Sequence, residues 1–422
     1  MKFLRTISTA RLLALIAGLV VAIGAVTAIA VAASGPGPIP KHKSLAKALH
    51  AALTAPAVTG ISARVSFTNN LIGSSDLAGT QASDPILTGS QGRLWLSDHH
   101  LRLELQSSNG DAQVVVDNSS FWVYDPVSHT VYEGSLPAGH SSASKHARAK
   151  DAGAQYEGIP TIAQIQTDLN KLVKHLNVSG AIPSDVAGHA AYTVRIRPKH
   201  DGGLLGAAEV AWDAVRGVPL RIAVYARNNS SPVLQLEATD ISYGKVSASD
   251  FNVSPPPGSK VVKISTTGHG KATSTKSKHG KRAAHVSASG VSASGVAAVA
   301  AKVPFKLMAP RSLVGLPRHT VSLLSWGGKP AALVTYGQNL GGIAVIEQTP
   351  SATGAHSAAK SSSSQSGAPS GLSLPTVSIN GATGQELDTA LGTVLTFSRG
   401  GVGYTVLGSV PSAAADAAAR AL

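Results

Sequence analysis

The chain has 422 residues, which is enough for two domains of ordinary size plus linkers. It contains no cysteine, which excludes disulfides, thiol nucleophiles, thiolate zinc sites and lipid anchors attached to cysteine. The net charge is +14, but the stretch from Phe251 to Ile346 has twelve Lys or Arg residues and no Asp or Glu, so the basic excess is largely a property of a linker.

The most informative early segment is an uncharged apolar run from Leu12 to Ala33, behind a basic stretch at 1–11. As a helix its 22 residues would extend about 33 Å, enough to cross a bilayer core. We therefore predict an uncleaved membrane anchor, with residues 1–11 in the cytoplasm and the bulk of the chain extracytoplasmic. The alternative is a long signal peptide cut near Ala33, which would give a secreted protein. The candidate membrane-anchor residues are Leu12, Leu19, Ile23 and Ile29.

Four stretches have compositions too poor in large apolar residues to form a core. They are a Gly/Pro-rich stalk at 34–43, a loop at 138–154, a basic linker at 259–303, and a Ser-rich insertion at 349–373. In the linker, no aromatic residue interrupts Lys260–Ala300, so nucleic acid bases would have no stacking platform there. Because the linker is predicted to lie outside the cytoplasm and has no aromatic residues, we predict no nucleic acid partner. Anionic lipid headgroups or wall polymers are better candidates, although a solvated spacer explains the charges as well.

The first folded segment is predicted to span 44–258. Leu45, Leu49 and Leu53 are spaced four apart and predict a helix over 44–53. Strand patterns follow, most clearly where Leu101, Leu103 and Leu105 alternate with polar residues. A second amphipathic helix is predicted over 162–176. Further strand patterns run from 192 to 243, which gives nine to eleven strands in meander order with two helices.

This order of elements predicts an α+β fold with an antiparallel sheet that curls without closing. Two helices can cover only part of its apolar inner face, which leaves an apolar cavity. For the aromatic residues among the candidates, a place in the ordinary core explains their pattern as well. The cavity candidates are Val65, Phe67, Trp95, Leu103, Trp122, Tyr124, Val194, Trp212 and Val224.

The second folded segment, 304–422, is predicted to be a small α+β domain interrupted by the insertion at 349–373. It contains six strand patterns between Val321 and Val410. Gly384–Leu391 is predicted to be a short helix or turn, and Ala413–Leu422 a C-terminal helix.

Catalytic and metal-binding patterns are missing from the sequence. Neither a Gly-x-Ser-x-Gly elbow nor a His-Glu-x-x-His pair is present. Glu209 and Asp213 would lie about 13 Å apart on one strand, too far for a glycosidase pair, and Asp213 fits a turn better. We therefore predict no catalytic residue, no metal site and no cofactor. A Ser/His hydrolase assembled only by the fold stays as an alternative.

Several short motifs of the first segment resemble the LolA/LolB/RseB-like superfamily. They are Trp212-Asp213, the turn and strand beginning at Gly217, the strand ending in Tyr243, the closing Phe251 with Pro255-Pro256-Pro257-Gly258, and the hairpin at Phe121–Pro126 with Tyr132. The resemblance implies an unclosed β-barrel with helices at its mouth and acyl chains in an apolar cavity. It covers about half of the chain and carries no catalytic residues.

The chain departs from the carriers of that superfamily in its predicted anchor and its second domain. An RseB-type sensor, which regulates an anti-sigma factor, also has a large LolA-like domain followed by a small one. The C-terminal segment does not match that small domain; its Pro304-Phe305 and Val334-Thr-Tyr336-Gly337 instead resemble a small extracytoplasmic domain of regulatory membrane proteins. The resemblance therefore implies a membrane-tethered regulator that binds a lipid or the acyl chain of a lipoprotein, with an anti-sigma-like membrane protein as partner. The alternative within the same resemblance is a soluble carrier released by signal peptidase.

Overall fold

The computed structural model describes residues 39–73, 83–97, 100–118, 120–135, 160–200, 202–264, 293–326, 329–350 and 374–422. The predicted anchor at 12–33, with Leu12, Leu19, Ile23 and Ile29, lies outside these residues, as do the loop at 138–154 and most of the linker and the insertion. In the described part of the chain, no helix has the length and apolar character needed to cross a membrane.

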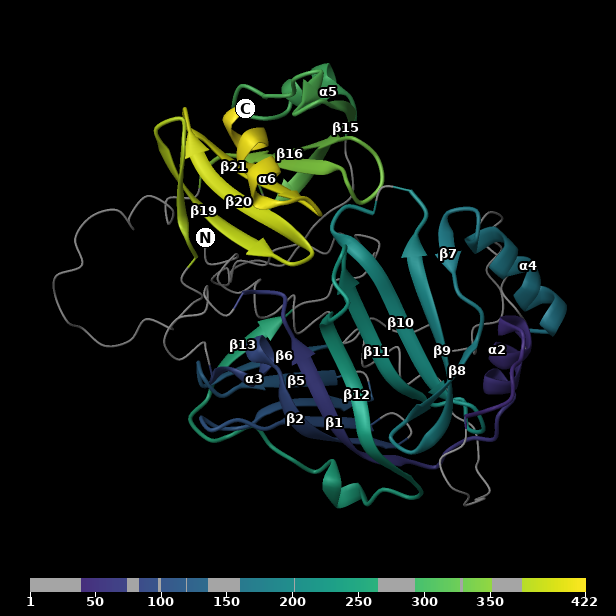
Figure 1. Ribbon diagram of the computed structural model, residues 1–422. Helices are drawn as coiled ribbons and strands as arrows, with labels where there is room; N and C mark the ends of the chain where they lie inside the picture. Colours follow the sequence, from purple (N-terminus) through teal and green to yellow (C-terminus); the bar gives the residue numbers. More distant parts are fainter. Residues whose placement is uncertain are drawn as a thin grey trace, which may run out of the picture.

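The first domain is built on one large sheet of 13 strands, antiparallel except at one edge (Figure 1). Its order is β13-β6-β5-β4-β3-β2-β1-β12-β11-β10-β9-β7, with β8 paired to β9. The strands are β1 (Ile61–Asn69), β2 (Ser90–Ser97), β3 (His100–Leu105), β4 (Ala112–Asp117), β5 (Ser120–Asp125), β6 (Thr130–Ser135), β7 (Leu176–Val178), β8 (Ile182–Val186), β9 (His189–Pro198), β10 (Leu205–Asp213), β11 (Pro219–Ala226), β12 (Pro232–Tyr243) and β13 (Lys260–Ile264).

The sheet consists of two meanders joined where the first strand, β1, pairs with the last strand of the second meander, β12. In Figure 1 the strands β9–β12 stand at a steep angle to β2–β6, so the sheet is curled but open. A β-bulge between Arg64 and Val65 lies at this join, and bulges increase local twist. The first domain is therefore mostly β, and its curled, unclosed sheet with few helices agrees with the predicted fold of an open antiparallel sheet.

The two predicted helices are present and short. α2 (Leu45–Leu53) begins at Ser44, whose side chain accepts a hydrogen bond from the Lys47 N–H. α4 (Ile162–Leu172) begins with a capping box between Thr161 and Gln164. They lie side by side at the β9 end of the sheet (Figure 1). A third short helix, α3 (Pro85–Thr88), was not predicted and packs against β1.

The predicted linker 259–303 is structured at both ends, which corrects its boundaries. Lys260–Ile264 forms β13, parallel to β6, with Lys260 opposite Thr130. At the other end, α5 (Val296–Ala300) places Val299 in the core of the second domain. The β-branched pair Val261-Val262 explains the first difference, since it favours a strand although the flanking lysines suggested a spacer.

The second domain has its own core, on one face of an eight-stranded sheet with the order β14-β15-β16-β17-β21-β20-β19-β18. The segment predicted as a short helix or turn, 384–391, falls mostly in strand β19, so that prediction was wrong. The C-terminal helix, α6 (Ser412–Arg420), was predicted correctly. The strands are β14 (Ser312–Leu313), β15 (Leu316–Trp326), β16 (Lys329–Tyr336), β17 (Ile343–Gln348), β18 (Thr376–Ile379), β19 (Ala382–Thr389), β20 (Gly392–Arg399) and β21 (Val402–Gly408).

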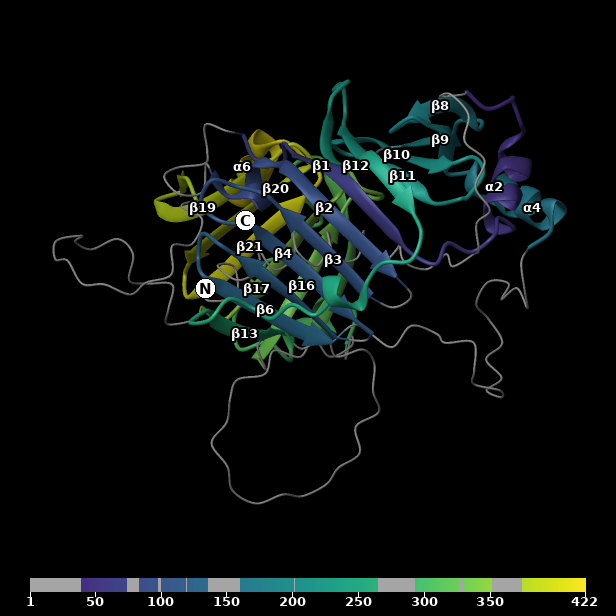
Figure 2. The same ribbon diagram turned by 90° about the horizontal axis from the view of Figure 1, so that it is seen from below.

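The two domains are joined by backbone hydrogen bonds. The Ala390 N–H donates to the Leu71 carbonyl at 2.8 Å, and the Leu204 N–H donates to the Ser409 carbonyl at 3.0 Å. Viewed from below in Figure 2, strands β1–β6 lie in front of the second domain. The 3-10 turn η3 (Ala248–Asp250) packs on the opposite face of these strands, where Arg102 donates to the Asp250 carbonyl. The second domain therefore lies on the face of β1–β6 that is opposite η3.

Candidate functional site

One face of the first sheet is apolar across nearly all its strands. Directly opposed residues share a face of an antiparallel sheet, so the register traces this face from strand to strand. Leu103 of β3, for example, is paired with Leu94 of β2 and Val114 of β4, and all three are buried. This surface, the concave face, is the one turned toward the second domain, because Arg102 and η3 occupy the other side.

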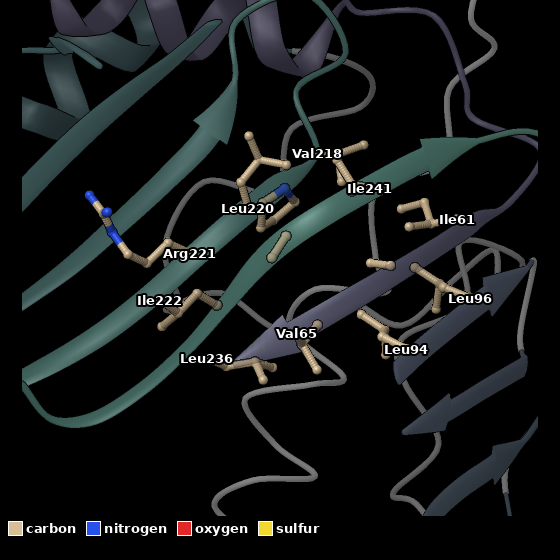
Figure 3. A pocket seen from close by; sticks show the side chains of 13 residues that line it. Ile61, Val65, Leu94, Leu96, Val218, Leu220, Arg221, Ile222, Leu236 and Ile241 are labelled. Carbon is tan, nitrogen blue, oxygen red and sulfur yellow. The ribbon is translucent and has the colours of Figure 1, made fainter. Parts of the chain in front are cut away.

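A pocket lies in the concave face where the two meanders join (Figure 3). Of its 13 lining residues only Arg221 is charged, and Figure 3 shows its side chain extending away from the apolar cluster. The Arg221 guanidinium instead meets Glu209 at 3.1 Å and Glu237 at 3.2 Å. The lining residues are Ile61, Ala63, Val65, Leu94, Leu96, Val218, Pro219, Leu220, Arg221, Ile222, Leu236, Ala238 and Ile241.

The cavity in this pocket has a volume of about 30 Å³. Cavities that hold small molecules usually have volumes of about 300–1,000 Å³. The pocket must therefore widen before it can hold an acyl chain. Some apolar side chains here are only half-buried, namely Leu96 and Ile222 in the pocket lining and Leu234 beside it, and they show where the concave face is incompletely covered.

Helix α3 covers part of the concave face, with Ile86 in the same apolar cluster as Val65 and Leu94. Two polar side chains hold it in place. Asn69 donates from Nδ2 to the Ile86 carbonyl at 2.7 Å, and Asp84 accepts from the Ile86 N–H at 2.9 Å. Burial, with a smaller contribution from the Asp125 carboxylate, raises the pKa of Asp84 to about 6. An element that covers the concave face beside the pocket is thus capped by a carboxyl group that changes charge under mildly acidic conditions.

Three of the predicted cavity residues lie on the concave face of β1 and β3. Val65 lines the pocket itself, while Phe67 and Leu103 belong to the same buried cluster. Val224 extends this face onto β11, where it is half-buried opposite Leu234.

Two other predicted cavity residues lie under helix α2. Val194 and Trp212 are buried with Tyr192 in a separate cluster, against which Leu45 and Leu49 of α2 pack. The register from β9 to β11 places them on the concave face as well. The helix therefore fills the β9–β10 end of this face, and the pocket is formed elsewhere.

The structure corrects the prediction for Trp95, Trp122 and Tyr124. All three project from the opposite, convex face, since their neighbours Leu94 and Val123 are on the concave one. The Arg102 guanidinium stacks on the Trp95 ring at 5.0 Å. Trp122 and Tyr124 belong to β5, which is apolar on both faces, so alternation does not tell which residues point inward. On β2, Trp95 shares its face with the polar residues Gln91 and Arg93.

Sequence reasoning missed most of the pocket lining, above all the residues of β2, β11 and β12. Leu94, Leu236 and Ala238 are all buried there. The alternation of apolar and polar residues along these strands is visible in the sequence. The pairing of β1 with β12 is not, because it joins residues about 170 positions apart.

The polar cluster around Asp213 has a structural explanation. Its Oδ1 accepts hydrogen bonds from the N–H groups of Val215 and Arg216, both at 2.8 Å, as expected of a turn residue. Its Oδ2 accepts from the Tyr243 hydroxyl at 2.9 Å and lies 3.4 Å from Nδ1 of His189. The carboxylate is thus committed to the β10–β11 turn. Among the described residues, no group of three or more His, Asp or Glu side chains is placed to hold a metal ion.

Comparison with known proteins finds similarity to solved structures, at low sequence identity. No protein-family model and no curated protein matches the sequence. Among solved structures, the chain is similar to a chain of the Pseudomonas aeruginosa MucA/MucB complex, with 14% identity and a TM-score of 0.37 over 89% of this chain and 94% of that one. It is also similar to a putative outer membrane lipoprotein-sorting protein domain from Vibrio parahaemolyticus, with 12% identity and a TM-score of 0.19 over 50% of this chain and 96% of that one.

Proposed function

We propose that the protein is a non-enzymatic extracytoplasmic protein that binds the acyl chain of a lipid or lipoprotein on the concave face of its first domain. The observation that carries this proposal is the pocket lining. Every side chain that points into the pocket is apolar, and the one charged residue beside it is turned away to two carboxylates. Such a surface offers burial of hydrocarbon and no group for acid–base or nucleophilic chemistry.

Binding would require the cavity to widen, because its volume is about that of one water molecule. The element placed to make room is α3, which covers the concave face beside the pocket. The helix has four residues: Asn69 of β1 bonds it to the sheet, Asp84 caps its own N-terminus, and Ile86 is buried. Its displacement would expose the cluster around Val65 and Leu103 to a ligand. Ligand occupancy would then be linked to the position of an element close to Leu71, which contacts the second domain through Ala390.

This link supports a regulatory role over that of a simple carrier. The second domain has a separate core and is joined to the first through a few backbone contacts, so it can supply a surface for a protein partner. The superfamily resemblance suggests an anti-sigma-like membrane protein as that partner. The alternative, a released soluble carrier, would be favoured by recovery from the medium of protein cut near Ala33.

The test is binding of a fluorescent fatty acid to the purified full chain, together with native mass spectrometry for co-purified lipid. The informative variant is Ala238→Phe, which places a ring in the pocket, and the matched control is Thr239→Phe at the neighbouring exposed bulge position. We expect the first to abolish probe binding and the second to leave it intact. Failure of the unmodified chain to bind acyl probes, or equal effects of the two variants, would contradict the proposal.

A further inference from the structure

The α2/α4 end of the first domain exposes several large apolar side chains. Leu172 is 47% exposed, Val173 41%, Ile162 40% and Leu53 39%. In α4 the apolar positions form one stripe along the helix, yet Ile165 is its one buried residue. The sequence predicted that this stripe would cover the sheet. In the structure α4 instead packs beside α2 and leaves much of the stripe in solvent (Figures 1 and 2).

The same end is strongly basic. Segments 39–53 and 160–178 contain one acidic residue, Asp168, which is paired with Lys171 at 2.9 Å. The exposed turn that ends α4 reads Lys171-Leu-Val-Lys-His175, so its apolar residues are flanked by cations. The exposed lysines of the two segments are Lys41, Lys43, Lys47, Lys171 and Lys174.

The chain holds this end close to the predicted membrane anchor. The Tyr192 hydroxyl donates to the Lys41 carbonyl at 2.5 Å, and the Lys43 ammonium lies 5.9 Å from the Tyr192 ring centre. Seven residues, 34–40, separate this point from the end of the apolar run at Ala33. A fully extended chain of that length spans about 25 Å at most. A bilayer that holds residues 12–33 is therefore within reach of α2 and α4.

From these three observations we infer that the α2/α4 end docks on an anionic phospholipid surface, with Leu172 and Val173 in the headgroup–acyl boundary and the lysines on the phosphates. Apolar side chains framed by Lys are the arrangement found in helices that lie on membranes. Each cation near an anionic leaflet contributes roughly a fivefold factor in binding. A second copy of the chain fits less well, because a symmetric contact would bring the lysines of both copies together.

The proposal is independent of whether the pocket is filled, so its test reports on α4 alone. The chain has no cysteine, so Leu172→Cys gives a single site for an environment-sensitive fluorophore on the full chain. The matched control is Leu340→Cys in the β16–β17 turn of the second domain, where the leucine is 50% exposed. Both proteins are reconstituted into vesicles of phosphatidylcholine, with and without phosphatidylglycerol.

We expect a blue shift at position 172 in vesicles that contain phosphatidylglycerol, quenching by spin-labelled lipid, and reversal by salt. Position 340 should not respond. Replacing Lys171 and Lys174 by Gln should weaken the response at 172 by more than half, and replacing Lys306 and Lys329 of the second domain by Gln should not. The inference is overturned by equal responses in the two lipid mixtures, by equal responses at 172 and 340, or by a response that follows protein concentration instead of lipid composition, which would indicate a second copy.

Discussion

The Met308 N–H donates a hydrogen bond to Oε2 of Glu347 at 2.8 Å, which fastens the segment before β14 to the core of the second domain. The Glu347 side chain is fully buried, and its other oxygen, Oε1, has no hydrogen-bond partner. A buried carboxylate with one unsatisfied oxygen is costly to ionise. Burial accordingly raises the pKa of Glu347 to about 7, although the Met308 hydrogen bond opposes the shift.

This pKa predicts a stability that falls with rising pH. The native state retains the Glu347 proton over a range, from its usual 4.5 to about 7, where the unfolded state has lost it. The free energy of unfolding should therefore decrease by roughly 3 kcal/mol between pH 4.5 and 7. Glu347→Gln keeps the shape and removes the charge. We expect its thermal unfolding to lack this slope, and a slope that persists would assign the effect to other groups.

The same argument applies to Asp84 in the first domain, over a lower range of pH. Its pKa is raised from 3.8 to about 6, so the free energy of unfolding should fall by about 3 kcal/mol between those pH values. Asp84→Asn retains a residue that can cap α3 and should flatten the profile. If ionisation also loosens α3, fatty-acid binding by the unmodified chain should be faster at pH 7 than at pH 5. Asp84→Asn should bind the fatty acid at the same rate at pH 5 and pH 7.

Alternation along the strands predicted much of the fold. Leu101, Leu103 and Leu105 were predicted on one face and lie on the concave face, and both helices begin within one residue of their predicted starts. Prediction failed where a strand is apolar on both faces, as at Trp122 and Tyr124. It also failed where structure depends on distant pairing, as in β13 on β6. Local patterns contain no information on which of two apolar faces the rest of the chain will cover.

The assignment of Leu96 and Trp95 to opposite faces makes a direct prediction. The two are neighbours on β2 and both are half-buried, but Leu96 lines the pocket and Trp95 stacks on Arg102. Leu96→Gln should weaken binding of a fatty-acid probe roughly tenfold, because a polar amide replaces apolar surface that a ligand would bury. Trp95→Gln should leave the affinity unchanged. Equal losses in the two variants, measured by fluorescence titration, would show that the ligand does not use the concave face.

The contact between the domains depends on Gly203, which has a φ of +61°. A Cβ at this position would lie 2.2 Å from the Ser409 carbonyl oxygen, the acceptor for the Leu204 N–H. Gly203→Ala should therefore break this contact. Gly188→Ala is the matched control: it also has positive φ, at +75°, but a Cβ there meets no atom within 4 Å. Both variants incur a backbone cost of about 1–2 kcal/mol.

The measurement is the relative motion of the two domains in solution. We expect Gly203→Ala to give a larger radius of gyration by small-angle X-ray scattering and two separate calorimetric transitions, because the cores on either side of the contact are independent. Gly188→Ala should slightly lower the unfolding temperature of the first domain and leave the radius of gyration unchanged. If Gly203→Ala does the same, the Leu204–Ser409 hydrogen bond does not position the domains, and the contact between Leu71 and Ala390 is sufficient to hold them together.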